Sequence, residues 1–172
     1  GYAERLPSTS EQFGFYIFNS QDGFDYVGDP DIKNEESYQV ELEFRENQKR
    51  WSYGVNLFAH ELPNYIFGKI DPELSAMTIG AAGVKRFVNL DYARISGFEF
   101  DVNYNIVHWS TIKTAFAYNY GVDNLGRPLP LISPLKNTTE LLFVFGVNRM
   151  SVKMTAALEQ NNVSEAAGEN MT

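Results

Sequence analysis

Side chains that could carry out acid–base chemistry occur as pairs of carboxylates two residues apart. Glu41 and Glu43 form one pair, and Glu99 and Asp101 form the other. Residues i and i+2 of a β-strand point to the same side about 7 Å apart, close to the carboxylate separation of glycoside hydrolases. The same spacing arises in any strand with one polar side, and no nucleophile elbow or phosphate-binding loop accompanies it. The pattern therefore favours a protein that is not an enzyme.

Few other reactive groups are present. The 172 residues include no cysteine, which removes thiolate chemistry and disulfides, and His60 and His108 are the only imidazoles. The net charge of −8 leaves no basic surface for neutralising phosphates, so nucleic acid is not an expected partner. No cofactor motif is evident, and we expect no cofactor.

The elements that position these residues alternate with a period of two, which is typical of β-strands. In residues 37–46, for example, Tyr38, Val40, Leu42 and Phe44 share one side and the polar residues share the other. Similar alternation predicts strands over residues 51–60, 93–106, 109–120, 136–148 and 151–160. Consecutive strands pair into three hairpins, so the sequence predicts an all-β, antiparallel up-and-down meander.

An apolar side can be buried against a second sheet or against lipid. The links distinguish the two, because the turns at residues 47–50, 107–109 and 148–151 are short, whereas the links 7–36, 61–85 and 121–134 are long. Short and long links also alternate in outer-membrane barrels. Trp51 and Trp109 lie beside short turns, where aromatic residues mark the membrane interface. The pattern favours a sector of a large outer-membrane β-barrel.

The alternative is a secreted, soluble β-sandwich that binds glycans. Its binding surface would be formed by aromatic residues of the first long link, namely Phe13, Phe15, Tyr16 and Phe24. A second sheet facing the first, with links of similar length at both ends, would support this alternative.

Three motifs, in order along the chain, resemble TonB-dependent outer-membrane receptors. Residues 5–8 and 28–38, followed by Glu41, resemble the family passage R-x-P-S … N-P-D-L-K-P-E-x-S … E and depart from it at Asp29 and Asn34. Residues 89–99 resemble N-x-x-x-A-R-I-x-G-x-E, and residues 126–134 resemble G-x-P-L-P-x-I-P-P, with Ser133 in place of a proline. The residues expected to have structural roles in these motifs are Pro30, Arg94, Gly97, Glu99, Pro128, Pro130 and Pro134.

The resemblance implies a receptor in the outer membrane of a Gram-negative bacterium. Such receptors capture a siderophore, haem or metal ion from outside and import it with energy from the TonB complex. The expected partners are therefore the TonB complex, outer-membrane lipid and an extracellular small molecule or metal. Residues 1–172 would form a partial barrel of about six or seven strands without the family's plug domain, so they could not transport alone. Such a piece is expected to self-associate through its open strand edges.

Three short strings look closest to receptors for copper or zinc, namely residues 64–67, 93–95 and 160–163. Metal capture requires His, Met or carboxylate groups in extracellular loops. The candidates are His60, Glu61, Asp71, Glu73 and Met77. His108, at a short turn, lies at the wrong rim for capture and is interpreted as a turn residue.

Overall fold

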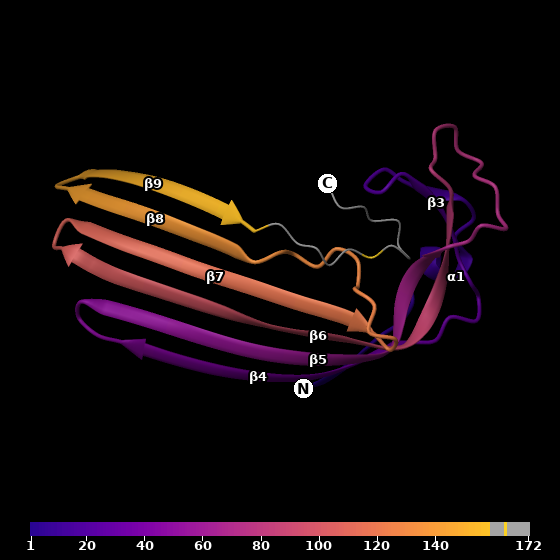
Figure 1. Ribbon diagram of the computed structural model, residues 1–172, viewed down its shortest axis with the longest axis horizontal. Coiled ribbons are helices and arrows are strands. Elements are labelled where there is room, and N and C mark those ends of the chain that lie inside the picture. The colour runs from indigo at the N-terminus through magenta and orange to yellow at the C-terminus, as the bar shows by residue number, and fades with distance from the viewer. Residues whose placement is uncertain (159–163, 165–172) are drawn as a thin grey trace.

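A computed structural model describes residues 1–158 and Ser164, and places most of them in one curved sheet (Figure 1). The strands that follow one another across this sheet are β1 (Tyr2–Arg5), β4 (Glu35–Asn47), β5 (Trp51–Ile70), β6 (Val84–Val107), β7 (Ser110–Asp123), β8 (Lys136–Phe145) and β9 (Asn148–Ala157). Helix α1 (Thr9–Phe13) and strands β2 (Ile17–Asn19) and β3 (Phe24–Val27) lie between β1 and β4 in sequence. Strand β3 joins the sheet by pairing in parallel with β6.

The neighbours from β4 to β9 are all antiparallel and follow chain order. This topology confirms the predicted all-β meander. The described residues contain no second sheet facing the first, and their long links gather at one end (Figure 1). The soluble β-sandwich is therefore wrong. No helix in residues 1–158 is long and apolar enough to cross a membrane.

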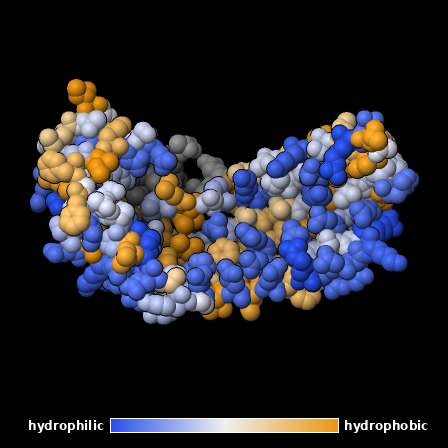
Figure 2. Space-filling view, turned by 180° about the vertical axis from the view of Figure 1, so that it is seen from behind, coloured by the Kyte–Doolittle hydropathy of each residue, from blue (hydrophilic) through white to orange (hydrophobic). Residues whose placement is uncertain are grey.

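One side of the sheet is polar. Residues that lie directly opposite one another share a side, and on this side Glu43 is opposite Asn56, which is opposite Glu99. Ion pairs cross it, for example Arg45 with Glu43 and with Asp101, both at 3.3 Å. Hydrophilic residues predominate over the hollowed middle of the molecule when it is seen from behind (Figure 2). We call this the inner side.

The other side, which we call the outer side, is apolar. Leu42, Leu57, Phe98 and Tyr118 form one continuous row across four strands. Leu42 keeps 66% of its surface exposed and Leu57 keeps 49%, although no protein covers them. Between the Glu61–Arg94 ion pair and the short turns, the outer sides of β5 and β6 carry no charged residue.

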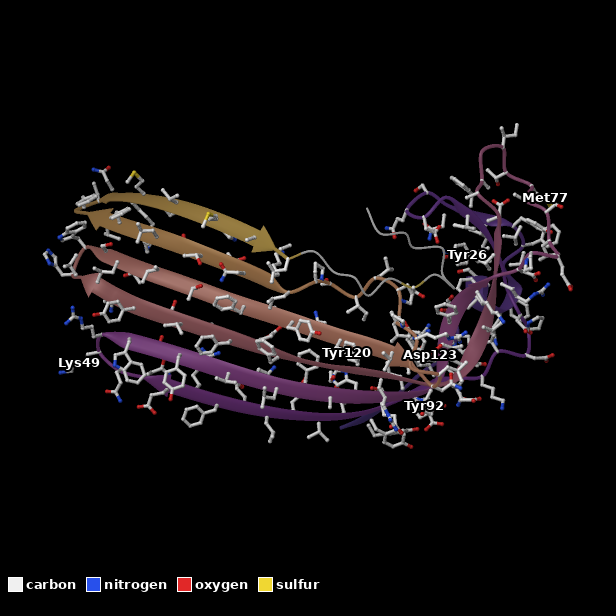
Figure 3. The ribbon with its side chains drawn as sticks, viewed as in Figure 1. Tyr26, Lys49, Met77, Tyr92, Tyr120 and Asp123 are labelled. Atoms are coloured by element: carbon white, nitrogen blue, oxygen red, sulfur yellow. The ribbon has the colours of Figure 1, made fainter. Side chains whose placement is uncertain are left out.

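Aromatic rings mark both limits of the apolar outer side. Near the short turns, Trp51 stacks on Tyr53 with centroids 5.4 Å apart, and Trp109 contacts Phe145 at 5.3 Å. Near the long links lie Tyr92 and Tyr120, at the opposite end of the sheet from Lys49 (Figure 3). The two belts enclose the run from Trp51 to Glu61, about 33 Å along a strand and about 25 Å in height when the strand is tilted.

Two predicted boundaries were wrong. The link predicted over residues 61–85 is shorter, because β5 continues to Ile70 and β6 begins at Val84, which leaves residues 71–83 as the loop. Apolar residues fall on both sides there, and Ile66 and Phe67 are both buried, so the period of two is lost. The third short turn lies at Gly146–Val147 rather than 148–151, because Gly146 adopts a positive φ of 60° that suits a tight hairpin. Residues 159–160 of the predicted last strand lie outside the described residues.

The β5–β6 hairpin turns away from the rest of the sheet at the long-link end (Figure 1). Asn64 has a φ of 53° and is skipped in the pairing between Pro63–Tyr92 and Tyr65–Leu90. Asparagine tolerates this left-handed conformation better than most residues. The Asn89 amide donates to the Asn64 carbonyl at 2.7 Å and holds the bend.

Gly97 makes room for an aromatic ring on the inner side. A Cβ at this position would lie 2.6 Å from the Phe58 ring and would collide with the Tyr118 carbonyl oxygen. We expect Gly97→Val to lower the free energy of unfolding of the protein by about 1–3 kcal/mol. Urea titration in detergent would measure it. Adding Phe58→Ala to Gly97→Val should recover part of the lost free energy of unfolding. The control Ser96→Val, which faces outward, should lower the free energy of unfolding little. Equal stability of Gly97→Val and wild type would contradict the packing argument.

Candidate functional site

The long-link end of the sheet carries a folded assembly of α1, β2, β3 and the loop at residues 71–83 (Figure 1). Its base is the Arg5 guanidinium, which pairs with Glu11 at 2.9 Å and with Glu35 at 3.4 Å. Ser8 caps α1, and its hydroxyl and backbone N–H exchange hydrogen bonds with Glu11. The R-x-P-S motif therefore joins helix, strand and link at one point.

The turn at Asp29-Pro30-Asp31 lies next to this base. The Asp29 carboxylate accepts the Asp31 N–H at 2.9 Å, and Pro30 lies exposed in the turn. The Asn89 side chain accepts the Lys33 N–H at 2.8 Å and donates to the Lys33 carbonyl. The first residue of the second family motif thus attaches this segment to β6.

Asp25 anchors the loop at residues 71–83. Its side chain is fully buried, and its Oδ2 accepts the backbone N–H groups of Met77 at 2.8 Å and Thr78 at 2.9 Å. The Thr78 and Met77 donors hold the pKa of the Asp25 carboxyl below its usual range, more than burial raises it. One buried acid thereby orders the tip of a long loop.

Lys85 lies beside this anchor and is only 3% exposed. Its ammonium pairs with Asp22 at 2.6 Å and lies 4.3 Å from the centre of the Phe24 ring. The Tyr26 hydroxyl donates to the same Asp22 carboxylate at 2.6 Å. Burial raises the pKa of the Asp22 carboxyl. The hydrogen bonds from Lys85 and Tyr26 lower this pKa by more than burial raises it, so the carboxyl stays ionised.

A cavity of about 520 Å³ opens on the side of the assembly nearest β2. Phe18, Tyr26 and Phe87 supply its aromatic walls, and Asn19, Ser20 and Gln21 supply polar groups. An open hollow that combines aromatic walls with several polar groups has the general character of a small-molecule site.

The structure does not gather the five predicted metal-ligand candidates into one site. His60 lies in β5 on the inner side, 4.0 Å from Glu41, and Glu61 lies on the outer side, paired with Arg94 at 2.9 Å. Asp71 is paired with Arg86 at 3.0 Å and accepts the Glu73 N–H. Met77 is 65% exposed at the loop tip (Figure 3). Nowhere in the described chain do three His, Asp or Glu side chains meet as metal ligands would.

The motif residues Arg94 and Glu99 of β6 lie on opposite sides of the sheet. Arg94 faces outward with its guanidinium 4.8 Å from the Tyr92 ring centre, and Glu99 faces inward opposite Asn56 and Ala117. Arg94 and Tyr92 therefore stand together where the apolar outer side ends.

The proline-rich link at residues 124–135 combines exposed residues with partly buried ones. Pro128, Pro130 and Pro134 are all partly buried, and Pro128 forms a bridge with Val122. Leu129 between them is only 1% exposed and packs against Leu62 and Ala93. The link folds onto the inner side because Leu129 packs against the apolar residues Leu62 and Ala93 there.

Three features of this end escaped the sequence analysis. The capping box Ser8-x-x-Glu11 is the local signal from which helix α1 could have been predicted. The anchor Asp25 and the buried Lys85 carry no local signal, because their partners lie 52 and 63 residues away.

The carboxylates of this assembly predict a response to acid. The pKa values of Asp22, Asp25 and Asp71 are all lowered in the folded state, so the stability they contribute is complete above their ordinary value and is lost as the pH falls through the folded pKa. The chain lacks cysteine, so a single spin label on Ser75→Cys would report the order of the 71–83 loop. We expect a constant spectrum from neutral pH to about 4 and increasing mobility below it. A label on Ser151→Cys is the control; mobility increasing already near neutral pH would contradict the assignment.

Solved structures share this fold. The copper transporter OprC is 21% identical with a TM-score of 0.78, and the match covers 96% of this chain and 24% of that one. The siderophore receptor PirA from Acinetobacter baumannii is 17% identical with a TM-score of 0.62, covering 97% and 28%. PirA from Pseudomonas aeruginosa is 15% identical with a TM-score of 0.61, covering 90% and 29%. The chain thus spans about a quarter of the length of these proteins. No curated protein matches it.

The sequence itself matches the family described as TonB dependent receptor-like, beta-barrel, over residues 1–151. That match includes all three motifs and the strands from β1 to the start of β9. The resemblance seen in the motifs is thereby confirmed: the chain belongs to the β-barrel family of TonB-dependent receptors.

Proposed function

We propose that this chain is a sector of the barrel wall of a TonB-dependent receptor that imports a scarce nutrient through the outer membrane of a Gram-negative bacterium. The observation that carries the proposal is the apolar outer side, which carries no charged residue on β5 and β6 between two aromatic belts, with the long links gathered beyond one belt. In this assignment the long-link end faces the cell exterior and the short turns face the periplasm.

The charged inner side would face the lumen and the plug of the complete receptor. The plug, together with the segment that contacts TonB, would belong to parts of the receptor beyond residues 1–172. The proposed role of this sector is therefore to form part of the barrel wall and to carry extracellular loops. The plug and the TonB-contacting segment would couple the energy to ligand import.

The proposed ligand is a metal ion or its chelate, and a haem is the less favoured choice. Its support is the family, in which one relative of the fold is named a copper transporter and another a siderophore receptor. Of the five candidates, Met77 remains the most available because its thioether is exposed, whereas Glu61 and Asp71 are held by arginines. A thioether suits copper, and an aromatic hollow suits a chelate. The string at residues 160–163 lies outside the described residues.

Labelling of intact cells tests the location. With a maleimide too large for porins, we expect Ser75→Cys in the 71–83 loop to react on intact cells. Val147→Cys at a short turn should react only after the outer membrane is opened. Equal reaction at both sites in intact cells would overturn the assignment.

Uptake assays test the ligand. Cells that express the receptor should accumulate labelled copper, or a ferric siderophore, only when TonB is present. Met77→Leu preserves the size of the side chain and removes sulfur. A several-fold loss of copper uptake in Met77→Leu, with unchanged siderophore uptake, would assign copper. A loss of siderophore uptake in Phe18→Ala, with unchanged copper uptake, would assign a chelate. Uptake independent of TonB would contradict the proposed function.

A further inference from the structure

The outer side has a hollow beside the Glu61–Arg94 ion pair. It has a volume of about 620 Å³, and most of its surface is apolar. The outer-side residues that line it come from three neighbouring strands and are Tyr38, Val40, Ala59, Glu61, Arg94 and Ser96. A volume of this size is typical of sites that bind a small organic ligand. We call it the outer hollow.

Two small side chains create the outer hollow. Ala59 lies directly opposite Ser96, and both are exposed. The next row of the outer side toward the short turns consists of larger residues, namely Leu42, Leu57 and Phe98. The next row toward the long links contains Tyr38, Glu61 and Arg94. The hollow is therefore a dip between two rows of larger side chains, and the described residues leave it open.

The outer hollow belongs to the apolar surface between the two aromatic belts. Ala59 lies eight residues beyond Trp51 in β5 and two residues before Glu61, so it is close to the long-link limit of that surface. The rings of Tyr92 and Tyr120 mark this limit (Figure 3). At this height, just inside an interfacial belt, a bilayer presents the part of an acyl chain that lies next to its headgroup.

Arg94 has unused donors at the edge of the hollow. Its Nε donates to Glu61 at 2.9 Å, and its guanidinium lies 4.8 Å from the Tyr92 ring centre. Its two Nη groups donate no hydrogen bond to any of the described residues. They form a fork that matches two oxygens of a phosphate. Because Glu61 balances the charge of Arg94, this fork would orient a phosphate through hydrogen bonds, with little attraction from a distance.

We propose that the outer hollow holds one acyl chain of lipid A and that Arg94 binds a phosphate of the same molecule. The inference rests on the proposed function, because lipid A, the phosphorylated lipid of the outer leaflet, meets the hollow only if the long-link end faces the cell exterior. Two observations select this occupant. The hollow is continuous with the apolar outer side, and the fork lies at the edge where headgroups begin. Burial of the chain supplies most of the affinity.

Native mass spectrometry tests the inference, with purified lipid A titrated onto the receptor that contains this sector, in detergent. Ala59→Phe fills the hollow, and we expect lipid A to bind about tenfold more weakly, the effect of losing the burial of about two methylene groups. Ser96→Leu fills the hollow from the neighbouring strand and should act in the same direction. The matched control is Ala156→Phe, which adds the same ring at an exposed outer-side position of β9 and should leave binding unchanged.

Lipid A without its phosphates tests the contact with Arg94. Wild type should bind this form several-fold more weakly than the phosphorylated form, whereas Glu61→Gln/Arg94→Gln should bind the two forms equally. Added salt should change the binding of wild type little, because the ion pair has no net charge to be screened at a distance.

Equal binding of lipid A by wild type, Ala59→Phe and Ser96→Leu would overturn the inference, as would an equal loss in Ala156→Phe. Equal binding of both forms of lipid A by wild type would contradict the role of Arg94. Displacement of lipid A by an equal amount of phosphatidylethanolamine would contradict the proposed occupant and assign the hollow to a phospholipid. None of these results changes the labelling of Ser75→Cys on intact cells. Absence of that labelling would remove the proposed function itself, so the two failures are distinguishable.

Discussion

Replacing Leu57 with arginine is expected to destabilise the receptor by about 2–4 kcal/mol, the cost of a cation at the middle of a lipid-facing barrel wall. Leu57 lies midway between Trp51 and Glu61 on the outer side, and its row neighbours are Leu42 and Phe98. The guanidinium would have to reach an interface about five residues away in either direction. Urea titration of the receptor in lipid vesicles would measure the loss.

The matched control is Ala117→Arg, at the same height on the inner side. Ala117 lies directly opposite Glu99 and Lys136, so a new cation there meets a carboxylate and a polar surface. We expect this variant to remain within about 1 kcal/mol of wild type. Equal costs for the two arginines would mean that the outer side does not face lipid, and the assignment of the two sides would fail.

The second large effect is expected from Asp25→Ala. The buried carboxylate accepts the N–H groups of Met77 and Thr78, and alanine leaves both donors without a partner inside the protein. The loop at residues 71–83 should then detach at neutral pH, which a spin label on Ser75→Cys would report as a mobile spectrum. Hydrogen exchange at the two amides should accelerate by roughly tenfold or more.

Two variants separate the anchor from a general effect of charge. Asp25→Asn keeps one carbonyl oxygen as an acceptor and should give an intermediate spectrum. Asp31→Ala removes an exposed acid from the neighbouring turn and should leave the loop as in wild type. If ligand affinity falls in Asp25→Ala while the urea midpoint of the barrel is unchanged, Asp25 stabilises the 71–83 loop and not the barrel wall. An immobile label in Asp25→Ala would contradict the anchoring role.

The strands of the wall could be predicted because each carries its own signal. Alternation in residues 37–46 and 51–60 defines two sides without reference to any other segment, and the structure pairs Leu42 with Leu57 as those sides require. The motif residues Arg94 and Glu99 could be assigned to opposite sides in the same way. Where both sides are buried, at Ile66 and Phe67, alternation disappears and the strand was missed.

The long-link end could not be predicted, because its stability depends on contacts between distant segments. Asp25 with Met77, Lys85 with Asp22, and Asn89 with Lys33 are each separated by more than 50 residues. The inward fold of the 124–135 link depends likewise on the hollow between Leu62 and Ala93 that receives Leu129. None of these pairs is visible in a local pattern.

The sequence by itself determined the two-sided antiparallel wall, its alternation of short and long links, and its family, because side-chain period and turn residues are local properties. Only the tertiary structure decided where the links fold and which distant groups neutralise the charges of the long-link end. The reason is that a buried charge needs a partner wherever the chain can bring one, and that choice is made by the assembled fold.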